Sequence, residues 1–276
     1  MRGQCMAGGA TMARSGSEDT LARGSFVRVL RAEALKSRHG APVRLAIALA
    51  LPFPLLAAFV ALSVPQFGLS YSPWNYWYAL LMPVSITLIA ATVANADARL
   101  GNHTLLSSGV PLHLAWGAKV AWCLALLLLS NLVVFAVYAV MSLVVPQGAV
   151  SMSAMLAVAL ALTVMGSWMI PATHFLTMRV GMLAGVFVPL AVQLALSLGW
   201  SVVPFWPACP PAATIVLPTA FLPVLPSGEP ASPGMALVES ISQGPDVALA
   251  LIVAAVLTAA LTAAGAVWLD RSEELR

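Results

Sequence analysis

The sequence predicts an all-α membrane protein with six transmembrane helices and with both termini in the cytoplasm. Three observations lead to this prediction. Of the 276 residues, 61% are hydrophobic and only 8% are charged, whereas a soluble domain is about 45–50% apolar and about 25% charged. Apolar runs recur along the chain, each about as long as a helix that crosses the hydrocarbon core. The basic residues also alternate between successive connecting segments.

The segment before the first apolar run divides into two parts. Residues 1–25 are rich in Gly, Ala, Ser and Arg, and we expect them to form a disordered tail. Residues 26–40 combine apolar side chains at helical spacing with four basic ones. This pattern predicts an amphipathic helix that lies in the membrane plane, with its basic face toward the lipid headgroups. Gly40 and Pro42 then end the helix.

One membrane domain, residues 44–270, contains the six predicted spans. Their bounds are 45–64, 77–95, 120–145, 154–173, 180–200 and 247–269. The fourth span is the least regular, because Gly166, Ser167 and Pro171 interrupt its end.

The distribution of Lys and Arg sets the expected orientation. The seven segments outside the spans contain 8, 0, 2, 0, 1, 0 and 2 basic residues, and these include all 13 of the chain. Because basic loops remain in the cytoplasm, we expect both termini and the second and fourth loops there, in a protein of the plasma membrane. Eight of the 13 lie at or before Arg44, which favours an anionic membrane surface over nucleic acid as their partner.

Aromatic residues mark the predicted outer surface. Tyr71, Trp74 and Tyr76 lie in the first outer loop, and Trp206 follows the fifth span. We interpret them first as anchors at the headgroup level. The last outer loop, 201–246, holds half of the twenty prolines and is partly apolar. We expect short helices or a re-entrant hairpin that caps the bundle, with a simple packed connection as the alternative.

Three kinds of chemistry are absent from the sequence. A P-loop ATPase needs a Gly-rich turn before Lys and Ser or Thr, but Leu35 precedes Lys36, and Val120 follows Lys119. An ion-coupled carrier buries ionisable residues at mid-membrane, and the predicted spans contain none. The four histidines form no HExxH pattern and fall in cytoplasmic or interfacial segments. We therefore expect no catalytic, cofactor-binding or metal-binding residue.

The polar residues inside the predicted spans are few and uncharged. Most of them are expected to form hydrogen bonds between helices. Asn131 and Gln193 are the better candidates for a substrate path, together with Trp206 at the outer end.

The inner loop after the second span is a candidate docking site for a soluble partner. Residues 104–108 are expected to form a short helix that Gly109 and Pro111 end. A short helix at the base of a bundle suits such docking, and a solvated loop is the alternative. The residues assigned to this docking loop are Asp97, Arg99, Gly101, His103, Thr104, Ser107, Ser108 and Lys119.

The order of these features resembles that of type-2 permease subunits of ATP-binding-cassette exporters. More narrowly, it resembles the permeases of lantibiotic-protection (immunity) transporters. Four stretches carry the resemblance: Phe26–Lys36 with its E-x-x-K pattern, Trp74–Pro83, Asp97–Lys119, and the outer loop with W-x-x-x-P at Trp206 and a P-x-G pattern at Pro226. Asp97 stands where the family usually has Glu, and Ser227 where it usually has Asn.

This resemblance implies a division of labour between subunits. A separate ATP-binding subunit, which carries ATP and Mg²⁺, docks under the inner loop, and two permeases, identical or related, form the pathway. The substrate is then a lantibiotic-like peptide that is expelled for self-protection. A permease for a drug, a lipid or a glycan is one alternative. A non-transporting membrane scaffold or sensor subunit is an alternative of another class.

Overall fold

The computed structural model describes residues 26–38, 40–98, 111–232, 234–242 and 245–273. Within these residues all regular secondary structure is helical, and the only β pairing is an isolated bridge between Val224 and Pro230. Five helices are long and apolar enough to cross a membrane. The predicted all-α fold is therefore confirmed for the described residues, as are five of the predicted apolar spans. These five are Ala41–Ser63, Ser72–Ala96, Leu112–Val144, Met152–Arg179 and Asp246–Arg271.

The span predicted at 180–200 is a shorter apolar helix, α10 (Met182–Leu198). Its 17 residues correspond to about 25 Å of helix, slightly less than the thickness of the hydrocarbon core. That α10 crosses the membrane stays a prediction.

The first span consists of two helices. After the helix over residues 26–37, Gly40 precedes α2 (Ala41–Ala48), and α3 (Pro52–Ser63) follows. Pro52 and Pro54 cause the break between α2 and α3, because each lacks a backbone N–H and crowds the carbonyl four residues earlier. The chain continues in nearly the same direction, so the two helices form one span of 23 residues.

The second span contains a local change of helix type. The short α4 (Ser72–Tyr76) continues into a π-helical turn, η2 (Trp77–Leu81), and then into α5 (Met82–Ala98). A π turn shifts the side chains that follow it around the helix axis, and such turns are often found at functional sites. Trp74, just before this turn, and Trp77 and Tyr78 within it are all fully buried.

The third and fourth spans are longer than the sequence analysis predicts. The third, α7 (Leu112–Val144), begins eight residues before the predicted boundary, directly after Pro111. The fourth consists of α8 (Met152–Gly166) and α9 (Met169–Arg179). A turn at Ser167 joins them, and Gly166 lets α8 approach α5, because a Cβ there would lie 2.7 Å from the Ile86 side chain.

Several short helices lie between the spans, at one end of the bundle. They are η1 (Pro65–Phe67), η3 (Trp200–Val202), η4 (Trp206–Ala208), α11 (Pro210–Val216), η5 (Leu217–Ala220) and α12 (Ala236–Ser242). All seven residues of α11 are buried, and α11 packs against α8, α10 and α13 (Asp246–Glu273). The expected short helices of the last predicted outer loop are therefore present, and α11 is inserted into the bundle.

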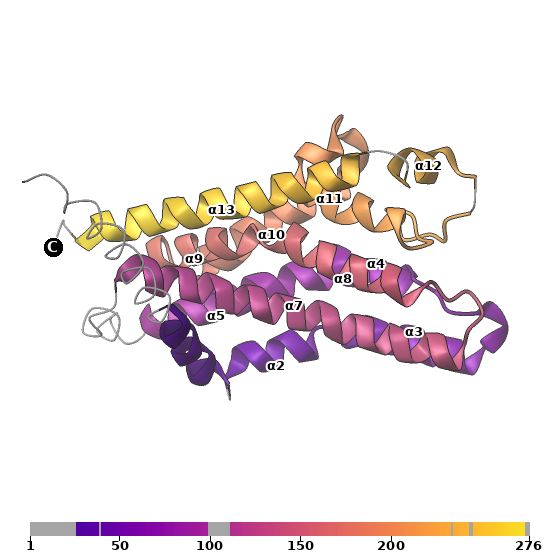
Figure 1. Ribbon diagram of the computed structural model, residues 1–276, viewed down its shortest axis with the longest axis horizontal. Helices are drawn as coiled ribbons and strands as arrows, with labels where there is room; N and C mark the ends of the chain where they lie inside the picture. Colours follow the sequence, from indigo (N-terminus) through magenta and orange to yellow (C-terminus); the bar gives the residue numbers. More distant parts are fainter. Residues whose placement is uncertain (1–25, 39, 99–110, 233, 243–244, 274–276) are drawn as a thin grey trace, which may run out of the picture.

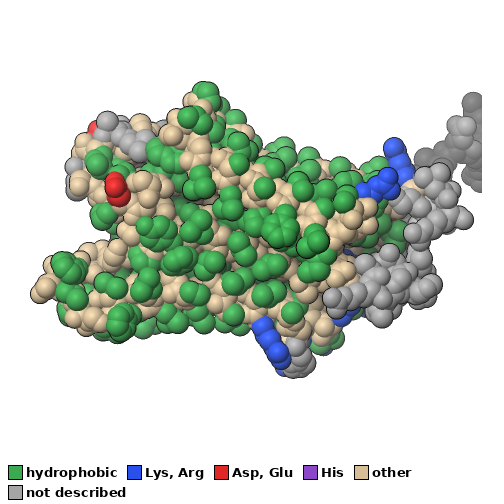
Figure 2. Space-filling view, turned by 180° about the vertical axis from the view of Figure 1, so that it is seen from behind, with side chains coloured by type: hydrophobic (Ala, Val, Ile, Leu, Met, Phe, Trp, Pro, Cys, Tyr) green, Lys and Arg blue, Asp and Glu red, His purple; other side chains and the backbone are tan. Residues whose placement is uncertain are grey.

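The helices lie side by side along one long axis (Figure 1). The helix over residues 26–37, the start of α7 and the last turns of α13 lie together at one end, which we call the basic end. The start of α4 and the short helix α12 lie at the opposite end, which we call the far end. On the face drawn in Figure 2, the Lys and Arg side chains gather toward the basic end, and the visible Asp and Glu side chains lie toward the far end.

Apolar side chains cover the outside of this bundle as well as its core. Figure 2 shows hydrophobic side chains over most of the length between the two ends. Phe59, Leu183 and Phe187 are among the large apolar side chains that are more than half exposed. A soluble monomer rarely exposes so much contiguous apolar surface. Lipid is the solvent that suits this surface, in agreement with the composition.

Candidate functional site

At the basic end, the helix over residues 26–37 packs on the first turns of α7. Phe26, Glu33 and Ser37 are spaced so that they share one face of that helix. The Phe26 ring lies beside Gly117 of α7, 3.6 Å from where a Cβ would stand. Ser37 is buried at the other end of the same face. The helix is thus attached to the bundle by one side, and its other side remains exposed.

A buried ion pair lies at the centre of this contact. Lys119 Nζ is 2.8 Å from Glu33 Oε1, and the two side chains are only 4% and 12% exposed. Withdrawing two charges from water is costly, and only a close partner compensates for that cost. The Glu33–Lys119 pair therefore fixes the helix over residues 26–37 to α7, because either charge would be destabilising in this buried place without the other.

The structure corrects the position that the sequence analysis gave to Lys119. We predicted it at the end of an exposed docking loop, but it lies in α7 and is buried. The predicted boundary was wrong because α7 extends toward the membrane surface beyond the uniformly apolar stretch. Lys119 is therefore the partner of Glu33 within the chain, and its assignment to a docking site stays a prediction.

The rest of the predicted docking loop is described only in part. Asp97 belongs to the last turn of α5. The remaining residues of the assignment lie outside the described residues: Arg99, Gly101, His103, Thr104, Ser107 and Ser108. The two helix ends that this loop connects, of α5 and α7, both lie at the basic end (Figure 1). Its role in docking stays a prediction.

Behind the ion pair lies a second buried group, around His174 of α9. His174 Nε2 is 3.8 Å from Cys123 Sγ of α7, and the His174 ring meets the indole of Trp116 edge-on, with centroids 5.9 Å apart. His174 is fully buried. The prediction that every histidine is cytoplasmic or interfacial stays a prediction, because burial among helices does not give the depth of His174 in the membrane. The span that contains His174 reaches Arg179, six residues past the predicted end.

Trp116 connects this group to the last span. Its Nε1–H donates a hydrogen bond to the Thr262 carbonyl oxygen of α13, 3.0 Å away. The indole ring packs directly on Gly265, and a Cβ at that position would overlap the ring. Most of α13 otherwise faces outward, since only 11% of its apolar window is buried. Trp116 is therefore a main attachment of α13 to the bundle at the basic end.

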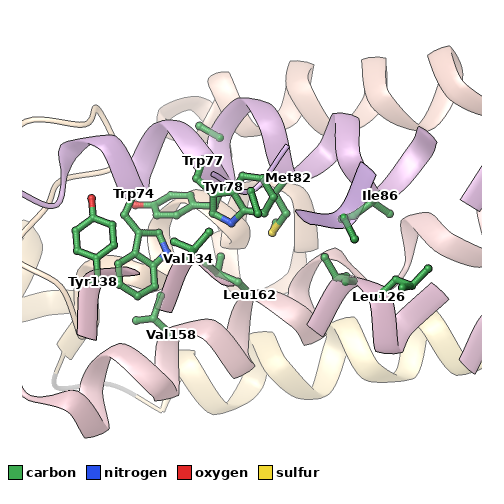
Figure 3. Close-up of a cluster of buried hydrophobic side chains, with 14 of the residues drawn as sticks. Trp74, Trp77, Tyr78, Met82, Ile86, Leu126, Val134, Tyr138, Val158 and Leu162 are labelled. Atoms are coloured by element: carbon green, nitrogen blue, oxygen red, sulfur yellow. The ribbon is translucent and has the colours of Figure 1, made fainter. Parts of the chain in front are cut away.

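The central and far parts of the bundle contain a cluster of large aromatic side chains (Figure 3). Trp74 and Tyr138 lie with ring centroids 4.6 Å apart, and Tyr71 stacks on Tyr138 at 5.3 Å. Trp74 and Trp77 are fully buried. The prediction that Tyr71 and Trp74 are headgroup anchors is therefore wrong, because both side chains are buried inside the bundle. Tyr76, which is 44% exposed, points outward as predicted.

Asn131 lies in the middle of a hydrogen-bond chain through this cluster. Trp77 Nε1–H donates to Asn131 Oδ1 at 3.1 Å, and Asn131 Nδ2–H donates to Thr163 Oγ1 at 3.0 Å. The Thr163 hydroxyl donates to the Ala159 carbonyl oxygen. These bonds join the second, third and fourth spans. The interhelical bonding expected of such residues is confirmed for Asn131, and its role on a substrate path stays a prediction.

Gln193 and Trp206 belong to a different network. Gln193 Nε2 lies 2.8 Å from Ser197 Oγ, and Ser197 Oγ–H donates to the Pro211 carbonyl oxygen at 2.8 Å. These bonds hold α11 against α10. The Gln193 Oε1 atom is buried and has no hydrogen-bond partner among the described residues. Trp206, in η4, packs on the smaller apolar cluster that includes Ala213 and Ala250.

A turn of the last outer loop closes the far end. Asn75 Nδ2–H donates to the Tyr78 hydroxyl at 2.8 Å and lies 3.3 Å from the Leu225 carbonyl oxygen. Gly228 adopts a φ of +90° in this turn, a conformation that favours glycine. The sequence analysis did not single out Asn75, and only its place between two aromatic residues of an expected loop could have indicated it.

The described part of the chain was also compared with the ligand sets that hold metal ions. No group of three or more His, Cys, Asp or Glu residues lies close enough there to hold a metal ion. A comparison with models of protein families, with curated proteins and with solved structures finds no match to this chain.

Proposed function

We propose that this chain is the membrane-spanning permease subunit of an exporter whose energy comes from a separate ATP-binding subunit. The observation that carries the proposal is the joint at the basic end. There, the helix over residues 26–37 is fixed by the Glu33–Lys119 pair to the start of α7, at the same end of the bundle as the last turn of α5. A partner that moves this joint would move both elements together.

The arrangement of the chain ends supports six crossings. The helix over residues 26–37 and the end of α13 lie at the same end of the bundle (Figure 1). Five crossings would leave them on opposite sides of the membrane, whereas a sixth crossing by α10 brings them to one side. The gathering of Lys and Arg at that end favours the cytoplasm of a plasma-membrane protein.

The missing chemistry supports an external source of energy. The chain has no P-loop Lys, and its buried ion pair joins two parts of the fold. A subunit that closes on ATP could bias the bundle between two arrangements if it contacts them differently. ATP and Mg²⁺ would then bind to the partner subunit.

Contact with a second permease is supported by the outward face of α13. Ala255, Ala259 and Ala263 are exposed at four-residue spacing on this helix. Small residues at that spacing let two membrane helices approach closely. Cysteines introduced at Ala259 should cross-link two copies if the partner is identical, and a cross-link to a different subunit would indicate a related permease.

The function is tested by an export assay, together with purification of the chain to identify the subunits that accompany it. The chain should co-purify with an ATP-binding subunit, and replacing Gly101–Ser108 by a Gly/Ser linker of equal length should leave ATP hydrolysis uncoupled from export. Intact coupling in that variant would contradict the docking assignment. If no ATPase is captured and deletion leaves export unchanged, the chain is a scaffold or a sensor.

The substrate class is tested separately, because the peptide assignment rests on the resemblance alone. Sensitive cells that express the complete transporter should survive a lantibiotic-like peptide and should remain susceptible to unrelated drugs. Protection against drugs but not against the peptide would support the drug, lipid or glycan exporter instead.

A further inference from the structure

A cavity of about 310 Å³ lies at the basic end, between the helix over residues 26–37, α2 and α7. Its lining is Arg31, Ala34, Leu35 and Arg38 from that helix, Val43 from α2 and Trp122 from α7. We call it the arginine groove. Its volume falls at the lower end of the range of ligand pockets.

The spacing of the lining residues explains how one helix contacts α7 through one face and lines the arginine groove with another. Positions 31, 34, 35 and 38 lie on one face of the helix. Glu33 points instead into the contact with α7, where it pairs with Lys119. The only acidic residue of this helix is therefore engaged elsewhere, and among the described residues no acidic side chain lines the arginine groove.

The groove presents two cations beside apolar walls. The side chains of Arg31 and Arg38 are exposed, and within the described part of the chain neither forms an ion pair. Seven residues separate them, which corresponds to about 10 Å along a helix. Leu35, which lies between them, is 57% exposed although it is apolar. A ligand that fits this groove carries a negative charge next to an apolar body.

We propose that the arginine groove binds one anionic phospholipid of the leaflet at the basic end. The phosphate lies between Arg31 and Arg38, since guanidinium groups bind phosphate with paired hydrogen bonds. An acyl chain lies along Ala34, Val43 and the Trp122 ring. Basic segments beside membrane spans attract anionic lipids, which concentrates the ligand at this place.

Trp122 supplies a second reason to expect a ligand with acceptor oxygens. Its indole Nε1–H is buried and has no acceptor among the described residues. Unsatisfied buried donors are uncommon in folded proteins. A small movement of the ring would bring this N–H to an ester oxygen of the bound lipid. The inference requires only that the chain lies in a membrane, so it is independent of the proposed export.

The experiment uses the full chain in bilayer discs of phosphatidylglycerol and phosphatidylcholine in equal parts, with retained lipid measured by native mass spectrometry. The wild type should keep one phosphatidylglycerol in preference to phosphatidylcholine. Arg31→Gln and Arg38→Gln should each weaken this retention about tenfold. The control, Arg44→Gln, removes an exposed arginine of α2 outside the groove, and it should change retention less than about twofold.

A second variant separates a lipid from a free phosphate ion. Ala34→Phe fills the apolar part of the groove and keeps both arginines, so it should also lose the lipid. Inorganic phosphate alone should not displace phosphatidylglycerol from the wild type. Gel filtration and helix content confirm that each variant is folded.

Three results would overturn the assignment. Equal retention by the wild type and by a variant that combines Arg31→Gln with Arg38→Gln would show that the groove binds no lipid. An equal loss in Arg44→Gln would indicate general attraction to the surface. If the arginine variants keep the lipid but lose a co-purifying subunit, the groove is a protein-docking surface.

Discussion

The basic end and the far end of this bundle are held together in different ways. At the basic end, one buried ion pair joins the helix over residues 26–37 to α7, and one indole ring joins α7 to α13. At the far end, aromatic rings pack on one another, and neutral hydrogen bonds connect several spans. The buried α11 adds a continuous apolar contact.

This difference indicates which end of the fold is more sensitive to single substitutions. A buried charge that loses its partner is costly, whereas a neutral hydrogen bond between membrane helices contributes little. The basic end should therefore depend on a few residues with large effects. The far end should depend on many residues with small effects. The predictions below test this contrast.

The largest effect is expected from Lys119→Met. It leaves the Glu33 carboxylate buried without a partner, which should cost about 3–5 kcal/mol of unfolding free energy. Reversible unfolding in detergent micelles measures it. The double variant Glu33→Leu, Lys119→Met should recover most of the loss, and Arg44→Met, at an exposed position, should change stability by less than about 0.5 kcal/mol. A small effect of Lys119→Met would show that the basic end does not depend on a few residues with large effects.

Gly265→Ala should have the second largest effect. The added Cβ would overlap the Trp116 ring, and overpacking of this kind costs about 1–3 kcal/mol. Thermal unfolding is the measurement. The matched control is Ala260→Val on the exposed side of α13, which should be nearly neutral in lipid. Combining Gly265→Ala with Trp116→Phe should cost less than the sum of the single effects.

Asn131→Leu should have a smaller effect, although it removes two interhelical hydrogen bonds. Bonds of this kind contribute about 0.6 kcal/mol on average and about 1.7 at most. A double-mutant cycle with Thr163→Val measures the coupling. Thr92→Ala is the control, because the Thr92 hydroxyl bonds only within its own helix. A loss as large as that of Lys119→Met would contradict the contrast. A loss of export out of proportion to stability would support the substrate-path prediction.

The smallest effect is expected from Tyr71→Phe. The ring keeps its stacking on Tyr138, and the variant loses two bonds of the hydroxyl: the one it accepts from the Val150 N–H, 2.8 Å, and the weak one it donates to the Met155 sulfur, 3.8 Å. This should cost at most about 1 kcal/mol. Burial raises the pKa of Tyr71 above its ordinary value, against a smaller opposing contribution from the Val150 N–H.

The raised pKa of Tyr71 also predicts a pH dependence. The hydroxyl stays protonated in the fold, so its contribution to stability is complete below about pH 10. That contribution should be lost as the pH rises through the raised pKa. The wild type should therefore lose more stability than Tyr71→Phe in strongly alkaline buffer. Parallel alkaline losses would show that this hydroxyl contributes nothing.

Much of the fold could be predicted because the membrane imposes simple rules on a sequence. Uncharged apolar stretches of sufficient length predicted the spans, and five of them are present with shifted ends. The shifts occur where a helix continues past the apolar stretch, as at Leu112, or through a Gly and Pro region, as at Gly166. Hydropathy does not detect such continuation, since backbone hydrogen bonding does not require apolar side chains.

The candidate sites were less predictable, because they depend on which side chains meet. Glu33 and Lys119 are 86 positions apart, and nothing in either segment indicates the other. Trp74 lies in a stretch with the aromatic composition of a surface anchor, yet it is buried against Tyr138 of α7. Asn131 was a candidate from the sequence, but its bonds to Trp77 and Thr163 follow only from the packing of three spans.

The sequence by itself determined the solvent of this protein, its helical class and the end at which its charges gather. These properties follow from composition and from the cost of burying charge in lipid, which are sums over residues. Only the tertiary structure decided that the helix over residues 26–37 is joined to α7 by an ion pair, that α11 is inserted into the bundle and that Arg31 and Arg38 line one groove. Those features are contacts between distant segments, and they exist only once the helices are packed.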